Sequence, residues 1–111
     1  MPNLSNAETR EPIERREIFT TNAATIFPRK TSNLYIVYSY GTHFPMWVYD
    51  GDLNQWFGNS DRYSRSTSKH QSLSRPNAQI DMCDTATLQQ IIAWDSYTEY
   101  AAYRVQREVA A

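Results

Sequence analysis

The stretch NLYIVYSYGTHFPMWVYDGDLNQWFG, residues 33–58, decides the fold class. Its β-branched and aromatic runs are typical of strands, and turn signals at Gly41 and at Asp50-Gly51 separate them. Because such short connections join neighbouring strands, the stretch predicts an antiparallel β-meander of three to four strands. The three strands that it predicts directly cover residues 33–40, 44–50 and 54–58.

Side chains alternate between the two faces of a strand, so the meander predicts two chemically different faces. One face is expected to be aliphatic and to need a cover, and it carries Leu34, Ile36, Phe44, Met46 and Val48. The other is expected to be mostly aromatic, and it carries Tyr35, Trp47, Tyr49 and Trp56.

The cover is expected from residues 84–110, which contain no Gly or Pro. Their apolar residues recur at helical spacing, and Asp84 or Thr85 is suited to cap the first turn. We therefore predict an α+β fold, with a long C-terminal helix packed across the meander in one domain of residues 13–111. The far end of this helix extends beyond a three-stranded sheet, so it either frays or packs on a second copy, as in a homodimer. Residues 1–12 have little to bury and are expected to be disordered.

Composition narrows the function classes. The chain has 111 residues, of which 41% are hydrophobic, and a formal net charge of −1. Its single cysteine, Cys83, excludes an internal disulfide, and no Cys/His set has zinc-ligand spacing. We expect no cofactor, and we find no apolar run that approaches the roughly 18 residues of a membrane span. The polar N-terminus does not resemble a signal peptide, so we expect a cytoplasmic protein.

Cations and hydroxyls concentrate in DRYSRSTSKHQSLSRP, residues 61–76, and no acid follows Asp61 until Asp81. A short helix is expected from Ser66 or Thr67 to about Ser74. Such a segment suits the binding of phosphates, because Arg and Lys neutralise them and hydroxyls donate to their oxygens. The alternative is a solvated loop whose hydroxyls cap and turn the chain. Under the first hypothesis the phosphates are held by Arg62, Arg65, Lys69 and Arg75, and the strand is oriented by Ser68, His70 and Gln71.

The aromatic face extends this hypothesis, because exposed Tyr35, Trp47 or Trp56 would stack on bases. The alternative places these rings in the core or at a dimer contact. His43, His70 and Lys69 would suit acid–base cleavage of RNA only if they met, and nothing in the sequence brings them together. We therefore expect no enzyme, and we interpret Cys83 as a small buried apolar group.

Two motifs carry a resemblance. The first is YSYGT, residues 38–42, and the second is YSRSTSKHQS, residues 63–72. With them the chain resembles a group of small uncharacterised bacteriophage and mobile-element proteins that share the pattern Y-S-Y-x-T and Y-S-x-T-T-S-K-H-Q-S. Ser66 replaces the first Thr of the usual pair. The resemblance covers roughly residues 33–75 and implies a phage or mobile-element origin, without implying an activity.

Two functional hypotheses remain. The first is a non-enzymatic phage accessory protein that binds nucleic acid through the basic segment. The second is a phage inhibitor of a host protein, such as a component of a defence system. Tyr and Trp are favoured anchors of protein interfaces, although the same residues would also suit a seam inside the molecule. The contact of the second hypothesis would be made by the C-terminal helix, through Trp94, Tyr97, Tyr100 and Tyr103.

Overall fold

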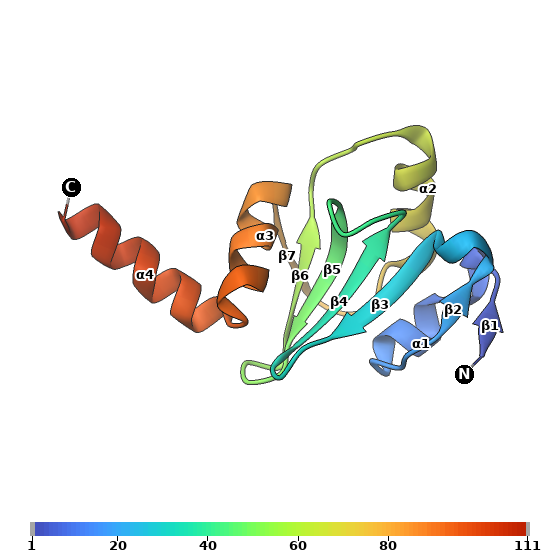
Figure 1. The fold of residues 1–111 in the computed structure, drawn as a ribbon, viewed down its shortest axis with the longest axis horizontal. Coiled ribbons are helices and arrows are strands. Elements are labelled where there is room, and N and C mark those ends of the chain that lie inside the picture. The colour runs from blue at the N-terminus through green and yellow to red at the C-terminus, as the bar shows by residue number, and fades with distance from the viewer. Residues whose placement is uncertain (1, 111) are drawn as a thin grey trace.

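The computed structural model describes residues 2–110, with the side chains described as far as residue 108. The fold is α+β, as predicted, and its sheet lies between helical segments on both faces (Figure 1). The elements in chain order are β1 (Asn3–Leu4), η1 (Asn6–Glu8), α1 (Arg10–Glu14), β2 (Thr20–Thr21), η2 (Asn22–Ala24), β3 (Ile26–Lys30), β4 (Leu34–Ser39), β5 (Pro45–Asp50), β6 (Gln55–Asn59), α2 (Arg65–Ser74), β7 (Ile80–Cys83), α3 (Thr85–Trp94) and α4 (Tyr97–Ala110).

The main sheet has five strands in the order β3-β4-β5-β6-β7. Strands β4, β5 and β6 form the predicted antiparallel meander, with Tyr35 opposite Tyr49 and Val48 opposite Phe57. Strand β3 adds an antiparallel edge and tolerates Pro28, because an edge strand has one side without ladder bonds. Strand β7 pairs parallel with β6, and α2 lies in the connection that a parallel pair requires.

Two hydrophobic clusters occupy the two faces of the sheet. The aromatic residues predicted to share a face do so, since Tyr35, Trp47 and Trp56 belong to one cluster and Tyr49 packs against it. The predicted aliphatic face is only partly correct: Leu34, Ile36 and Val48 lie in the second cluster, but Phe44 and Met46 join the aromatic one. A register shift between Val37 and Tyr38 lies beside this part of β5, and an irregularity of this kind reverses the alternation of side chains.

The N-terminal segment covers the aromatic face. Ile13 and Phe19 are buried in the aromatic cluster, and Leu4 packs against it. Residues 3–12, which were expected to be disordered, form β1, η1 and the start of α1, and β1 pairs with β2. Thr9 is fully buried. The prediction of disorder is corrected here because the sheet offers this otherwise polar segment a large apolar surface for its few apolar side chains.

The expected C-terminal helix is divided in two. Helix α3 covers the aliphatic face through Leu88 and Ile91, and Asp84 caps it by accepting the Thr87 N–H at 2.8 Å, as predicted. The helix ends at Asp95, which has a left-handed φ of 55°. Thr31 and Ser32 donate to the Asp95 carboxylate, and the Asn33 side chain donates to its carbonyl at 3.0 Å. These tertiary bonds fix the break, which the sequence pattern does not indicate.

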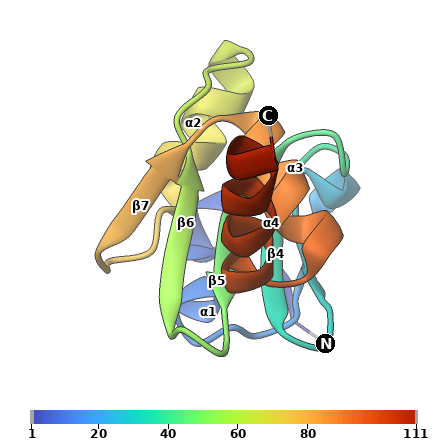
Figure 2. The same ribbon diagram turned by 90° about the vertical axis from the view of Figure 1, so that its left-hand side faces the viewer.

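Helix α4 projects from the body of the molecule (Figures 1 and 2). Its base is fixed, because the Tyr97 N–H donates to Asp50 Oδ2 at 2.9 Å and the Tyr97 ring stacks on Phe57. The projection contributes to a molecule of 47 × 28 × 23 Å. None of the helices in residues 2–110 has the length and apolarity that crossing a bilayer requires.

Candidate nucleic-acid interface

The two sequence motifs meet in space. Ser39, in the first motif, places its Oγ 2.8 Å from Nδ1 of His70 in the second. The next residue, Tyr40, lies on the His70 ring with a centroid separation of 5.0 Å. On the other side of the same loop, His43 and Phe44 contact the Tyr63 ring. The β4–β5 loop and the start of α2 therefore form one surface at this end of the sheet.

Helix α2 begins one to two residues earlier than predicted, because Ser64, and not Ser66 or Thr67, caps it, with its Oγ accepting the Thr67 N–H at 3.1 Å. The face that it buries is polar, and is formed by Thr67, His70, Gln71 and Ser74. Each of these groups has a hydrogen-bond partner, which is what burial of polar atoms requires. Ser74, for example, accepts the indole N–H of Trp47 at 2.9 Å and donates to the His70 carbonyl.

His70 is held inside this polar contact. Thr25 donates to Asn6 Oδ1, which turns the Asn6 amide N–H toward His70 Nε2 and leaves the ring proton on Nδ1, facing Ser39. Burial lowers the pKa of His70, and the Lys69 charge lowers it further. His70 is therefore a neutral structural residue, and its predicted role in orienting a nucleic-acid strand is corrected.

Gln71 is corrected for the same reason. It is 2% exposed, and its Nε2 donates to the Asn59 carbonyl at 3.0 Å and to the Asp61 carbonyl at 3.3 Å. Its Oε1 accepts from Arg62 Nη1 at 3.0 Å. The side chain has no polar atom left for a ligand. Ser68, the third residue of that predicted set, is half-buried on α2.

The predicted cations are exposed. Arg65 and Lys69 lie one turn apart on the outward side of α2, whereas Arg62 and Arg75 line a small cavity beside Trp47. Within residues 2–110, ion pairs join Arg15 to Glu17 and Arg104 to Glu108, and the four cations of this segment form none. Their charge is consequently not neutralised by carboxylates of the described chain.

The predicted stacking face is wrong. Tyr35, Trp47 and Trp56 are 3%, 1% and 5% exposed, because the N-terminal segment covers them. Exposed aromatic rings at this end of the molecule come instead from Tyr40 and Tyr63, which are 54% and 70% exposed. The sequence did not single them out as stacking residues. A usable signal was present, since both lie in motifs and in segments without strand periodicity, where binding residues concentrate.

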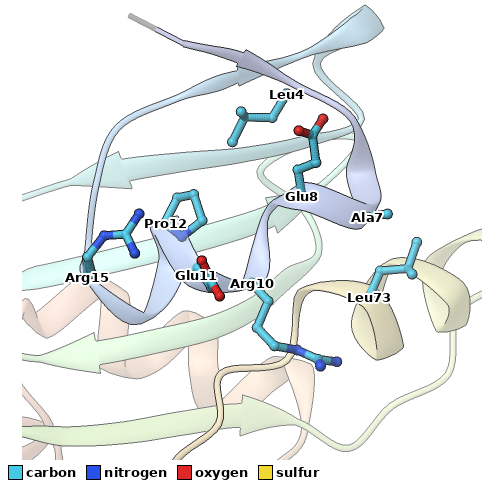
Figure 3. A pocket seen from close by; sticks show the side chains of 8 residues that line it. All are labelled: Leu4, Ala7, Glu8, Arg10, Glu11, Pro12, Arg15 and Leu73. Atoms are coloured by element: carbon cyan, nitrogen blue, oxygen red, sulfur yellow. The ribbon is translucent and has the colours of Figure 1, made fainter.

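A groove between the N-terminal segment and α2 borders this surface (Figure 3). Arg10 reaches across it and donates to the Ser72 carbonyl at 2.8 Å. The groove mixes Arg10 and Arg15 with Glu8 and Glu11, so it does not present a surface of one charge. The Arg10–Ser72 bond across the groove connects the N-terminal segment to α2.

The C-terminal aromatic residues are divided between the inside and the outside. Tyr97 and Tyr100 pack against the aliphatic cluster, as the alternative of an internal seam predicted. Trp94 and Tyr103 are 38% and 43% exposed, and their ring centroids lie 5.1 Å apart. Of the four residues predicted to contact a partner, only Trp94 and Tyr103 remain suited to that role.

A metal-binding cluster and a reactive thiol are two further kinds of site that the described part of the chain could hold. No group of three or more His, Cys, Asp and Glu side chains there is placed to hold a metal ion. Burial, followed by the charges of Asp84, Asp81 and Asp61, raises the pKa of the Cys83 thiol to about 11. Cys83 therefore stays protonated and is a poor nucleophile at neutral pH.

Comparisons with protein-family models, with curated proteins and with solved structures found no match to this chain. The resemblance carried by the two motifs thus stays a prediction, and the function has to be argued from the site itself.

Proposed function

We propose that this chain is a non-enzymatic accessory protein of a phage or mobile element whose α2 end binds the phosphate backbone of a nucleic acid. The observation that carries the proposal is the set of exposed cations on α2 and its two flanks, Arg62, Arg65, Lys69 and Arg75, without ion-pair partners among the described residues. Cations in this state attract phosphates by releasing their counterions.

The exposed rings support a single-stranded ligand. Tyr40 and Tyr63 flank the start of α2, and bases of any sequence stack on such rings. One side of Tyr40 is supported by His70, and Tyr63 rests on His43 and Phe44. Rings held in this way lose little freedom when a base stacks on them.

The test is a titration of labelled single- and double-stranded oligonucleotides at low and moderate salt. We expect tighter binding of the single strand, with affinity that falls steeply as salt rises. Arg65→Gln combined with Lys69→Gln should weaken binding and reduce the salt slope by about 2, because each phosphate contact contributes about one unit. Arg107→Gln on α4 is the matched control and should change neither. Absence of binding at low salt would overturn the proposal.

A second candidate function, inhibition of a host protein through the C-terminal helices, is favoured by the exposed Trp94–Tyr103 pair. A nuclease-treated pull-down separates the two functions. Under this second candidate, one captured protein is lost with Tyr103→Ala and retained with Tyr63→Ala. The second candidate is contradicted if neither variant changes the capture of that protein, or if Tyr63→Ala abolishes it.

A further inference from the structure

A small cavity lies between α2 and the sheet, apart from the outward side of α2 that carries Arg65 and Lys69. Its volume is about 50 Å³, and its lining includes Trp47, Asn59, Arg62, Gln71 and Arg75. This space admits a group the size of a few water molecules or one tetrahedral oxyanion.

Both guanidinium groups at the cavity are held in place by buried residues. Arg62 donates to Gln71 Oε1, and the Gln71 amide is itself fixed by its bonds to the Asn59 and Asp61 carbonyls. The Arg75 guanidinium lies 5.6 Å from the centroid of the Trp47 ring. The two side chains are thus oriented by the fold before any ligand arrives, which lowers the entropic cost of binding.

The charged side chains that line this cavity, Arg62 and Arg75, are both cations. No carboxylate lines it, and Arg62 and Arg75 form no ion pair within the described residues. Two cations that share a small cavity repel each other, and an anion between them removes that repulsion. Guanidinium groups suit phosphate in particular, because their planar sets of donors match two of its oxygens.

We propose that Arg62 and Arg75 form a site for one phosphate group, supplied as the terminal phosphate of a nucleic-acid strand or as free phosphate. If the phosphate is the end of a strand, the site rests on the proposed function. If it is free phosphate, the site does not depend on that function. Arg65 and Lys69 then contact any phosphate along the backbone of the strand. The cavity, in contrast, selects a terminal or free phosphate.

The experiment is an NMR titration of the ¹⁵N-labelled full chain with inorganic phosphate, against sodium chloride at equal ionic strength. We expect saturable shifts of the Arg62 and Arg75 Nε signals and of the Trp47 indole N–H. Arg62→Gln and Arg75→Gln should each weaken phosphate binding by about tenfold or more, in line with the loss of a charge-assisted bidentate contact. The matched controls, Arg65→Gln and Lys69→Gln, should leave it unchanged, and unfolding curves should show that all four variants fold.

A second arm compares one oligonucleotide with and without a 5′-phosphate. Tighter binding of the phosphorylated strand, lost with Arg62→Gln and kept with Arg65→Gln, identifies the strand's end as the source. Saturable binding of inorganic phosphate without any oligonucleotide binding identifies free phosphate, and it contradicts the proposed function while supporting the site. Phosphate shifts that are absent, or that all four variants weaken equally, overturn the site even if oligonucleotides bind.

Discussion

Helices α2 and α4 differ in what attaches them to the sheet. Helix α2 buries a polar face, and side-chain hydrogen bonds from His70, Gln71 and Ser74 hold it in one orientation. Helix α4 is attached at its base, through Tyr97 and Tyr100, and carries exposed side chains along most of its length. The first is fixed by several directional side-chain bonds, and the second by apolar contact together with one such bond, from the Tyr97 N–H to Asp50, at its first turn.

The difference shows how to interpret a segment rich in hydroxyls and cations. In α2 the hydroxyl and amide side chains mostly hold the helix, and the cations, which do not hold it, remain exposed. Directional bonds therefore fix the backbone from which Arg65 and Lys69 extend. The exposed part of α4 has no comparable set of tertiary hydrogen bonds. Its side chains therefore suit a partner that orders them when it binds.

The largest expected effect comes from the apolar contact of the C-terminal region. Leu88→Ala removes a fully buried side chain of α3 and should lower the free energy of unfolding by about 2–5 kcal/mol. Val105→Ala on α4, where the side chain is exposed, should lower it by less than about 0.5 kcal/mol. Urea unfolding measures both. Equal losses would mean that α4 belongs to the core and that the comparison with α2 is wrong.

The next largest effect tests the polar attachment of α2. Ser74→Ala leaves the buried Trp47 N–H without its acceptor and should cost about 1–3 kcal/mol in urea unfolding. Ser72→Ala, on the exposed side of the same turn, serves as the control and should be nearly neutral. If the two variants were equally stable, directional bonds would not be what holds α2.

A smaller effect is expected at the start of α2. Ser64→Ala removes the acceptor of the Thr67 N–H and should lower the free energy of unfolding by about 1 kcal/mol. Ser66→Ala lies in the same turn, is exposed, and should have little effect. A cost at Ser66 that matched the cost at Ser64 would argue against capping as the cause.

The last prediction concerns pH. The pKa of His70 is lowered from 6.5 in the folded chain, so below that value the unfolded chain binds more protons. Stability should therefore fall as pH drops below about 6.5 and should stop falling for this reason once the folded-state pKa is passed. Unfolding curves at about pH 7.5 and about pH 5.5 should show this loss, and His70→Gln should reduce it. If His43→Gln reduced the loss and His70→Gln did not, the pH dependence would come from His43 and the prediction would be wrong.

The meander was predictable because β-branched and aromatic runs, separated by turn residues, carry a strong local signal. Strands β3 and β7 were not predicted, since Pro28 interrupts the first pattern and the second is only Ile80–Cys83. The break at Asp95 was also missed, because the local sequence favours helix on both sides and the residues that impose the break are Thr31, Ser32 and Asn33.

The candidate site was predicted in part. Its cations were found from charge alone, because a run without acids has no local partners for them. The predicted stacking face was wrong, because alternation along a strand shows which rings share a face and not whether a distant segment covers it. The exposed rings of Tyr40 and Tyr63 lie outside the strands, where that alternation gives no information.

The sequence by itself determined the β-meander, the capped helix that covers its aliphatic face, and the concentration of positive charge between residues 62 and 75. These properties depend on side-chain periodicity, turn residues and charge, which act over a few neighbouring positions. The tertiary structure alone decided which groups are free: it buried His70, Gln71 and the tryptophans of the sheet, and left Arg62 and Arg75 together at one cavity. The burial and hydrogen-bond pairing of these groups depend on segments far apart in the chain, and no local pattern encodes them.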